Sequence, residues 1–230
     1  MINKPDMDIQ NIILTIAKSL PGLLLAIVAH EWAHGFMAKK FGDDTAEREG
    51  RLTLNPAAHI DVFGTLIVPL MCVMFGGLVF GWAKPVPIVP RNFKDVDKGI
   101  FWVSFAGPLM NFILGISSAI LFAVFVTQVP DTFSFYSILA QMLQYSVLIN
   151  FVLGAFNLIP LPPLDGSNML STFLKGEMKM QYLGMARYAN FIFMGIFALS
   201  MVGIPTIGYL ISPVVMIGQK LSMYFLYLLG

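Results

Sequence analysis

Charged residues are scarce in this chain of 230 residues: Asp, Glu, Lys and Arg make up 12%, whereas 57% of the residues are apolar. A soluble domain carries about 25% charged residues, so this composition argues against a soluble globular protein. The formal net charge is only +1 and no block of basic residues occurs, which argues against a nucleic-acid partner. A single cysteine, Cys72, excludes an internal disulfide and a site built from several thiolates.

Long stretches without a charged residue indicate the class of protein. Three of them, at 100–126, 137–164 and 188–219, exceed the roughly 20 apolar residues that a helix needs to cross a bilayer. The polar first ten residues show no signal-peptide cleavage site, so the first hydrophobic helix, expected at 12–40, should remain in the mature protein. The sequence predicts a multi-pass membrane protein in which 188–229 is long enough for two spans.

The apolar segment 62–82 contains several glycines and a proline, and a proline-rich stretch follows at 84–90, which argues against one straight helix. Short cytoplasmic loops collect Lys and Arg. If 62–82 enters and leaves the membrane on one side, all the basic residues of the loops share that side: Lys39, Lys40, Arg48, Arg51, Lys84, Arg91, Lys94, Lys98, Lys175, Lys179 and Arg187. We therefore expect an all-α polytopic protein of five to six transmembrane helices with a re-entrant or β-hairpin segment, forming a single domain over 1–230.

His30, Glu31 and His34 form a His-Glu-Trp-Ala-His sequence inside the first apolar span. Residues four apart lie on one face of a helix, so both imidazoles can bind one ion while Glu31 lies beside them. In zinc peptidases the metal lowers the pKa of a bound water to near 7 and the glutamate takes its proton. Ionisable groups inside a span are costly, so three in five residues favour a catalytic role over a structural one.

A catalytic zinc usually has a third protein ligand, and Asp165 is our candidate. It follows the sequence Asn-Leu-Ile-Pro-Leu-Pro-Pro-Leu at 157–164, where the prolines interrupt a helix and let a side chain turn inward beside a wet cavity. In the alternative interpretation, Asp165 caps a short helix at the membrane surface and binds no metal. Spacing alone does not decide between the two.

The motifs AHEWAH, FAGPLMN and NLIPLPPLDG, in this order, resemble the site-2 protease family of intramembrane metalloproteases. The segments RLTLNPAAHIDVFGT and FGWAKPVPI are similar to the corresponding parts of compact prokaryotic members. The resemblance implies a Zn²⁺ site made by His30, His34 and Asp165, with Glu31 as general base. It also implies a multi-pass protein of a prokaryotic cytoplasmic membrane; the oligomeric state is not indicated.

The resemblance further implies a transmembrane protein as substrate. An unwound substrate would add to the edge of a membrane-embedded strand at 81–88, with Val86 and Ile88 as contacts. Asn157 would contact the substrate backbone or steady the reaction centre. Asn111 either contacts the substrate near the site or joins two helices, as polar residues in spans often do.

Other interpretations are weighed against these motifs. A transporter or channel would show inverted repeats and further buried charges, and neither is visible in the sequence. A non-catalytic relative that only binds substrates would be expected to have lost Glu31 or a ligand. Glu177, the only glutamate after Glu49, lies in a charged loop and suits a ligand less well than Asp165. His59, next to Ile60 and Asp61, fits a structural hydrogen bond better than a metal ligand.

Overall fold

The computed structural model describes residues 9–68, 70–71, 83–132, 134–189, 191–192, 195, 199 and 206–230. Four helices within these residues are long and apolar enough to cross a membrane: α1 (Ile9–Phe41), α4 (Val96–Gln128), α5 (Tyr136–Asn157) and α9 (Thr206–Leu229). The shorter helical elements are α2 (Thr45–Arg48), η1 (Pro56–Ala58), η2 (Val62–Ile67), η3 (Pro90–Asn92), α6 (Asp165–Ser171), α7 (Gly176–Gly184) and η4 (Met185–Tyr188). The described residues contain no β-strand.

The expected all-helical class is therefore confirmed for the described part of the chain, where four candidate spans stand against the five to six predicted. The re-entrant segment predicted at 62–82 lies largely outside the described residues, and only its start is seen, as the π-helical turn η2. Of the strand predicted at 81–88, residues 81–82 are not described. The remainder has no regular secondary structure and pairs with no strand in the described structure.

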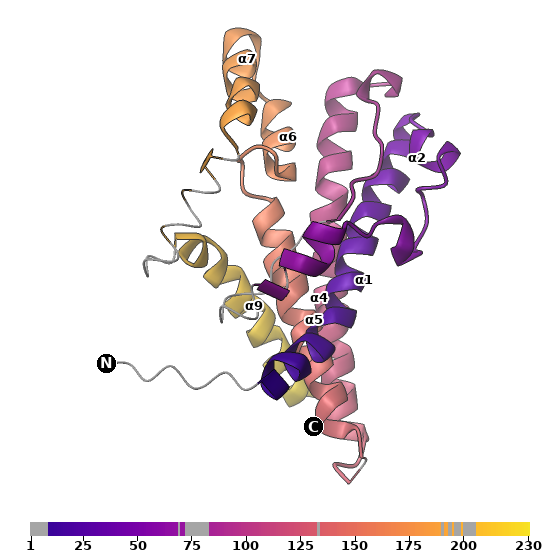
Figure 1. The fold of residues 1–230 in the computed structure, drawn as a ribbon, viewed down its shortest axis with the longest axis vertical. Helices are drawn as coiled ribbons and strands as arrows, with labels where there is room; N and C mark the ends of the chain where they lie inside the picture. Colours follow the sequence, from indigo (N-terminus) through magenta and orange to yellow (C-terminus); the bar gives the residue numbers. More distant parts are fainter. Residues whose placement is uncertain are drawn as a thin grey trace.

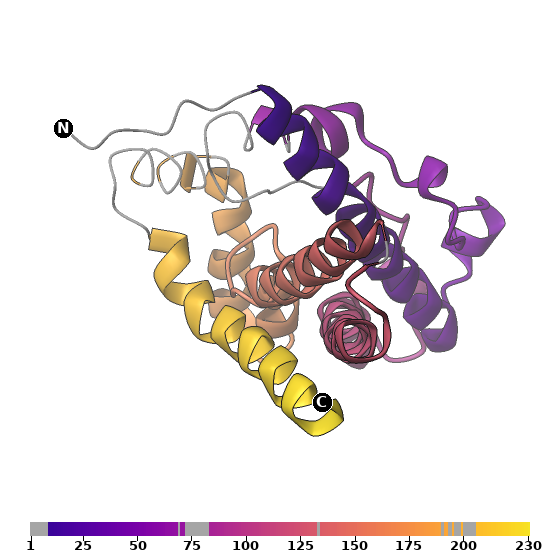
Figure 2. The same ribbon diagram turned by 90° about the horizontal axis from the view of Figure 1, so that it is seen from below.

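Helices α4 and α5 lie in the middle of the molecule, with α1 on one side and α9 on the other (Figures 1 and 2). The buried face of α4 consists largely of small residues, including Gly107, Gly115, Ser118 and Ala119. Small side chains let helix backbones approach closely, which is how helices associate where apolar surface alone gives no driving force. This close packing brings groups on α4 within reach of α1.

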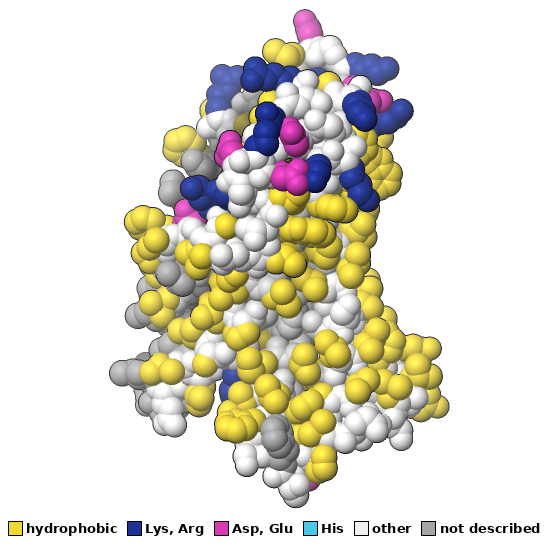
Figure 3. All heavy atoms as spheres, turned by 90° about the vertical axis from the view of Figure 1, so that its right-hand side faces the viewer, with side chains coloured by type: hydrophobic (Ala, Val, Ile, Leu, Met, Phe, Trp, Pro, Cys, Tyr) yellow, Lys and Arg dark blue, Asp and Glu magenta, His cyan; other side chains and the backbone are white. Residues whose placement is uncertain are grey.

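Charged side chains gather at one end of the molecule and a broad apolar surface lies below them (Figure 3). The end of α1 and the start of α4 lie next to each other, because the amide of Lys94, just before α4, donates to the Phe41 carbonyl at 3.0 Å. The chain between these two residues therefore leaves and returns at the same end of the molecule.

Residues 83–92, which we call the linker segment, run back toward α4 and are held by side chains of the 43–51 region. The Arg51 guanidinium donates through Nη2 to the carbonyls of Lys84 (2.9 Å) and Pro85 (3.1 Å). Three of its ten residues are prolines without an amide donor, and its position depends on contacts from outside the segment such as these.

Asp43, just beyond the end of α1, is the second anchor of the linker segment. Its buried carboxylate accepts from the Val89 amide (2.7 Å), from the Asn92 side chain (2.8 Å) and from Thr45. Burial works to raise the pKa of Asp43, but the hydrogen bonds from Thr45, Val89 and Asn92 outweigh it and hold the pKa below its ordinary value. The helix that carries the His-Glu-Trp-Ala-His motif is thus tied directly to the linker segment.

Candidate active site

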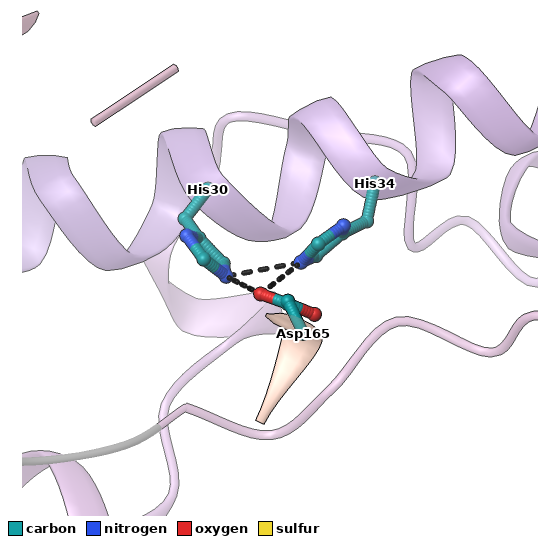
Figure 4. Close-up of side chains that lie close together, drawn as sticks. All are labelled: His30, His34 and Asp165. Atoms are coloured by element: carbon teal, nitrogen blue, oxygen red, sulfur yellow. Dashed lines mark hydrogen bonds and ion pairs between the residues drawn. The ribbon is translucent and has the colours of Figure 1, made fainter. Parts of the chain in front are cut away.

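The structure brings His30, His34 and Asp165 together from two elements, α1 and the first residue of α6 (Figure 4). The Nε2 atoms of the two histidines are 3.0 Å apart. One carboxylate oxygen of Asp165, Oδ2, lies 3.2 Å from Nε2 of His30 and 3.4 Å from Nε2 of His34. Both histidines are buried, at 7% exposure each, and the Asp165 side chain is 16% exposed, so the three ionisable side chains meet largely away from solvent.

The hydrogen bonds behind the two rings define where their protons lie. Nδ1 of His30 is 2.6 Å from Oδ1 of Asn111, and Nδ1 of His34 is 2.7 Å from the Val103 carbonyl. Both partners are acceptors, so each Nδ1 carries a proton, and in a neutral ring Nε2 then presents a lone pair. Two such lone pairs and a carboxylate oxygen repel one another unless a positive charge lies among them.

The spacing of these three atoms suits a zinc ion. Zinc–ligand bonds of about 2.0–2.2 Å in a tetrahedral arrangement set neighbouring ligand atoms roughly 3.3–3.5 Å apart. The observed separations of 3.0–3.4 Å are close to this range. Oδ2 of Asp165 is also buried and receives no hydrogen bond from the described residues, although buried polar atoms are normally paired. The donor set and its geometry therefore fit zinc.

The start of α6 explains how Asp165 reaches the histidines. The helix does begin at Asp165, as the capping interpretation supposed, but the cap residue is Leu164 and no side chain caps the helix. A Cβ added to Gly166 would come within 2.2 Å of the Leu158 carbonyl oxygen, so only glycine permits this approach to the end of α5. The tight turn leaves the carboxylate free to point at α1.

Gly107 of α4 packs directly against the two histidines, and the buried Pro108 follows it in the helix. The sequence analysis singled out neither residue. A Cβ on Gly107 would lie 2.5 Å from Nε2 of His34 and 2.7 Å from Cε1 of His30. Pro108 lacks the amide that would bond the carbonyl four residues earlier, that of Ser104, the residue after Val103. Both residues belong to the motif FAGPLMN, which was the available signal.

Glu31 is half-buried, and its Oε2 accepts a hydrogen bond from the Val86 amide at 2.8 Å. The Val86 side chain is buried, at 6% exposure. The structure thus places Val86 against the glutamate rather than at a free edge. Ile88 packs on the cluster formed by Ala38, Phe93 and Val103, and its amide has no partner among the described residues.

The remaining predicted residues lie at different distances from the histidines. Asn111 is fully buried behind His30, with both ends of its amide bonded inside the protein, so it offers no group to a substrate. Asn157, at the end of α5, donates to the Leu153 carbonyl of its own helix. His59 is buried outside the cluster and its Nε2 lies 2.8 Å from the Thr53 carbonyl, in agreement with a structural role.

Comparison with known proteins bears directly on this geometry. The model of peptidase family M50 matches residues 19–203, which include both elements of the site. This chain belongs to peptidase family M50, the site-2 proteases. Among its relatives is "Putative zinc metalloprotease YwhC" of Bacillus subtilis, 36% identical over 176 residues, which cover 76% of this chain and 77% of the relative.

Two further relatives of this site-2 protease carry similar names. "Putative zinc metalloprotease Rip2" of Mycolicibacterium smegmatis is 32% identical over 69% of this chain and 58% of its own length. "Zinc metalloprotease MJ0392" of Methanocaldococcus jannaschii is 28% identical over 66% of this chain and 33% of its own length. No solved structure matches the chain. The protein is a zinc metalloprotease with several apolar helices that fit a multi-pass membrane protein, which confirms the family, the enzyme class and the metal predicted from sequence.

Proposed function

We propose that this site-2 protease hydrolyses peptide bonds in or near the transmembrane segments of membrane proteins, with zinc bound by His30, His34 and Asp165 and with Glu31 as general base. One observation carries the assignment of the ligands: two imidazole lone pairs and an unpaired carboxylate oxygen meet within 3.4 Å in a buried site. Such a set is unfavourable without a cation and favourable around one.

When bound, zinc lowers the pKa of water and polarises a peptide carbonyl. The residues of the chain then supply the proton transfers. Glu31 takes the proton of the attacking water and returns it to the departing amine, which is the role of a general base that later acts as an acid. The Val86 amide, bonded to Oε2, holds the carboxylate in one orientation beside the histidines.

The linker segment is the proposed docking site of an unwound substrate. Of the two predicted contacts, the Val86 amide is occupied by Glu31, whereas the amide of Ile88 remains for edge pairing. Oδ1 of Asn157 is an acceptor that no described residue uses, which suits a contact with a substrate amide. We assign the substrate backbone to Ile88 and Asn157, and we assign Val86 to the support of Glu31.

The charged end of the molecule defines the proposed orientation in the membrane. Ten of the eleven basic loop residues fall in 39–51, 84–98 and 175–179, and Arg187 follows shortly after. By the positive-inside rule this end faces the cytoplasm of a prokaryotic cell, with the protein in the cytoplasmic membrane. The substrate reaches the site laterally from the bilayer, and 62–82 is re-entrant.

Zinc analysis of detergent-purified protein, combined with cleavage of a model transmembrane peptide, tests the proposal. Replacement of His30, His34 or Asp165 by Ala should abolish stoichiometric zinc, because each removes a ligand. Glu31→Gln should retain zinc and lose cleavage, because an amide cannot accept the proton. His59→Gln is the matched control and should retain zinc. Full zinc in Asp165→Ala would overturn the ligand assignment, and near-normal cleavage by Glu31→Gln would overturn the general base.

A further inference from the structure

A buried polar network runs from His30 into the helix bundle. Its members, all at most 7% exposed, are His30, Asn111, Asn150, Ser146 and Ser118. Asn111 accepts from His30 and donates to Oδ1 of Asn150 at 3.2 Å. Asn150 in turn donates to the Ser146 carbonyl at 2.9 Å, and the Ser146 and Ser118 hydroxyls are 2.8 Å apart. The network joins α1, α4 and α5 in the apolar interior.

The backbone carbonyls of Ser146 and Ala26 determine which group donates in each hydrogen bond that connects them to His30. A carbonyl only accepts, so the Ser146 carbonyl requires the NH₂ group of Asn150, which turns Oδ1 of Asn150 toward Asn111. Asn111 must then present its own NH₂ group to Asn150 and to the Ala26 carbonyl, which is 3.1 Å away. Its oxygen is left facing His30.

The orientation of Asn111 decides which nitrogen of His30 faces the candidate metal site as a lone pair. With Oδ1 of Asn111 as acceptor, the proton of His30 lies on Nδ1 and Nε2 is free. If the amide were reversed, its NH₂ group would face Nδ1 and the proton would move to Nε2, where a metal binds. Partners behind metal ligands set tautomer and ring position in this way.

We propose that Asn150 is a positioning residue of the metal centre, which acts through Asn111 to hold His30 in its metal-binding tautomer and orientation. The inference rests on the proposed role of His30 as a zinc ligand. Asn150 is hydrogen-bonded to Asn111 and Ser146 and to none of the three proposed ligands, so its effect on zinc should pass through Asn111. This dependence separates positioning from a general contribution to helix packing.

The test is a double-mutant cycle read as zinc affinity, measured by competition with a chelator on purified full-length protein without substrate. Loss of a partner behind a ligand weakens metal binding by about 10–100-fold, which is the expectation for Asn111→Leu. We expect Asn150→Leu to weaken zinc binding by roughly three- to tenfold, since Asn111 keeps its bond to the Ala26 carbonyl. In the Asn111→Leu background, Asn150→Leu should cause no further loss.

Three further variants make the outcomes distinguishable. Asn150→Asp should restore near-normal affinity, because a neutral carboxyl group offers the same pairing of one donor and one acceptor. Ser118→Ala removes the buried hydrogen bond between the Ser118 and Ser146 hydroxyls, which does not orient the side-chain amide of Asn111 or Asn150. It should leave zinc affinity unchanged. Asn150→Ala replaces Asn150→Leu if the larger side chain gives too little folded protein.

The measured zinc affinities test the positioning role of Asn150 and the metal-site assignment separately. Normal zinc affinity in folded Asn150→Leu or Asn150→Ala would overturn the positioning role, as would an equal loss in the presence and absence of Asn111. If His30→Ala itself binds zinc like the unsubstituted protein, the proposed metal site is wrong and the positioning role falls with it. Loss of zinc in His30→Ala without an effect at Asn150 would overturn the positioning role alone.

Discussion

Gly107→Ala should separate the stability of the helix from the binding of zinc. The added methyl carbon would lie 2.5 Å from Nε2 and 2.6 Å from Cε1 of His34, where ordinary contact begins at 3.4 Å. The ring must therefore move by roughly 0.9 Å, far more than the tolerance of about 0.2 Å for bond lengths at a metal site. The bond from Nδ1 of His34 to the Val103 carbonyl opposes this movement.

Two effects of opposite sign follow from this substitution. Alanine is favoured over glycine inside a helix by about 0.8–1 kcal/mol, so α4 itself should not be weakened. Zinc affinity should fall by at least the roughly 10–100-fold typical of disturbed ligand orientation, and peptide cleavage should fall with it. No general loss of folding is needed for either effect.

Zinc affinity by chelator competition and thermal unfolding in detergent together measure the two effects. Gly115→Ala is the control, because it makes the same change in the same helix and its methyl carbon meets the Phe151 ring at 2.8 Å, away from the histidines. It should lose stability through that contact and keep its zinc affinity. Zinc affinity and cleavage at the level of the unsubstituted protein in Gly107→Ala would refute the close packing of α4 on the histidines.

Three further predictions concern the charged end of the molecule. The lowered pKa of Asp43 means that its carboxylate stabilises the fold above the ordinary value of 3.8 and that this contribution is lost as the pH falls below it. Asp43→Asn should lower stability at neutral pH by about 2–3 kcal/mol and should make stability depend less on acid pH. The control Asp44→Asn, at an exposed position, should leave stability nearly unchanged, as measured by thermal unfolding. Arg51→Ala should reduce cleavage several-fold with zinc content intact, because the carbonyls of Lys84 and Pro85 lose their donor. Arg51→Lys should recover part of the activity. Equal cleavage by the unsubstituted protein and both variants would exclude a role for this anchor. Cysteines at Arg48, Lys94 and Lys179 should be labelled from one side of the membrane and a cysteine at Asp131 from the other, whereas opposite sides for Arg48 and Lys94 would make 62–82 a true span.

Site residues of a distinctive chemical type could be predicted from the sequence alone. Ionisable groups in an apolar span are rare enough to be noticed, which led to His30 and His34 and to Asp165 as a candidate. Spacing left Asp165 open between a metal ligand and a helix cap, and the resemblance to site-2 proteases favoured the ligand. The proline-rich approach to Asp165 also indicated a break in the helix, and the structure ends α5 at Asn157 and begins α6 at Asp165.

Backbone groups, and side chains whose role depends on a tertiary contact, could not be predicted in this way. The partner of His34 is a backbone carbonyl, which every residue possesses. Asn150 lies 39 positions from Asn111, and nothing in the sequence says that the two amides meet across α4 and α5. The amide of Val86 was expected to be free to bond a substrate, but it donates to Glu31. That bond depends on tertiary packing, which the pattern of residues along the sequence does not reveal.

The positions of the proposed zinc ligands along the chain also determine when the site can be completed during synthesis. His30 and His34 enter the membrane with the first helix, whereas Asp165 emerges from the ribosome only after α4 and α5 have been made. At roughly 5–20 residues per second, this leaves an interval on the order of ten seconds between the first two groups and the third. During that interval a nascent chain holds an incomplete site beside other newly inserted proteins. If these three residues hold the metal as proposed, the site is completed only after the helices that enclose it have been made.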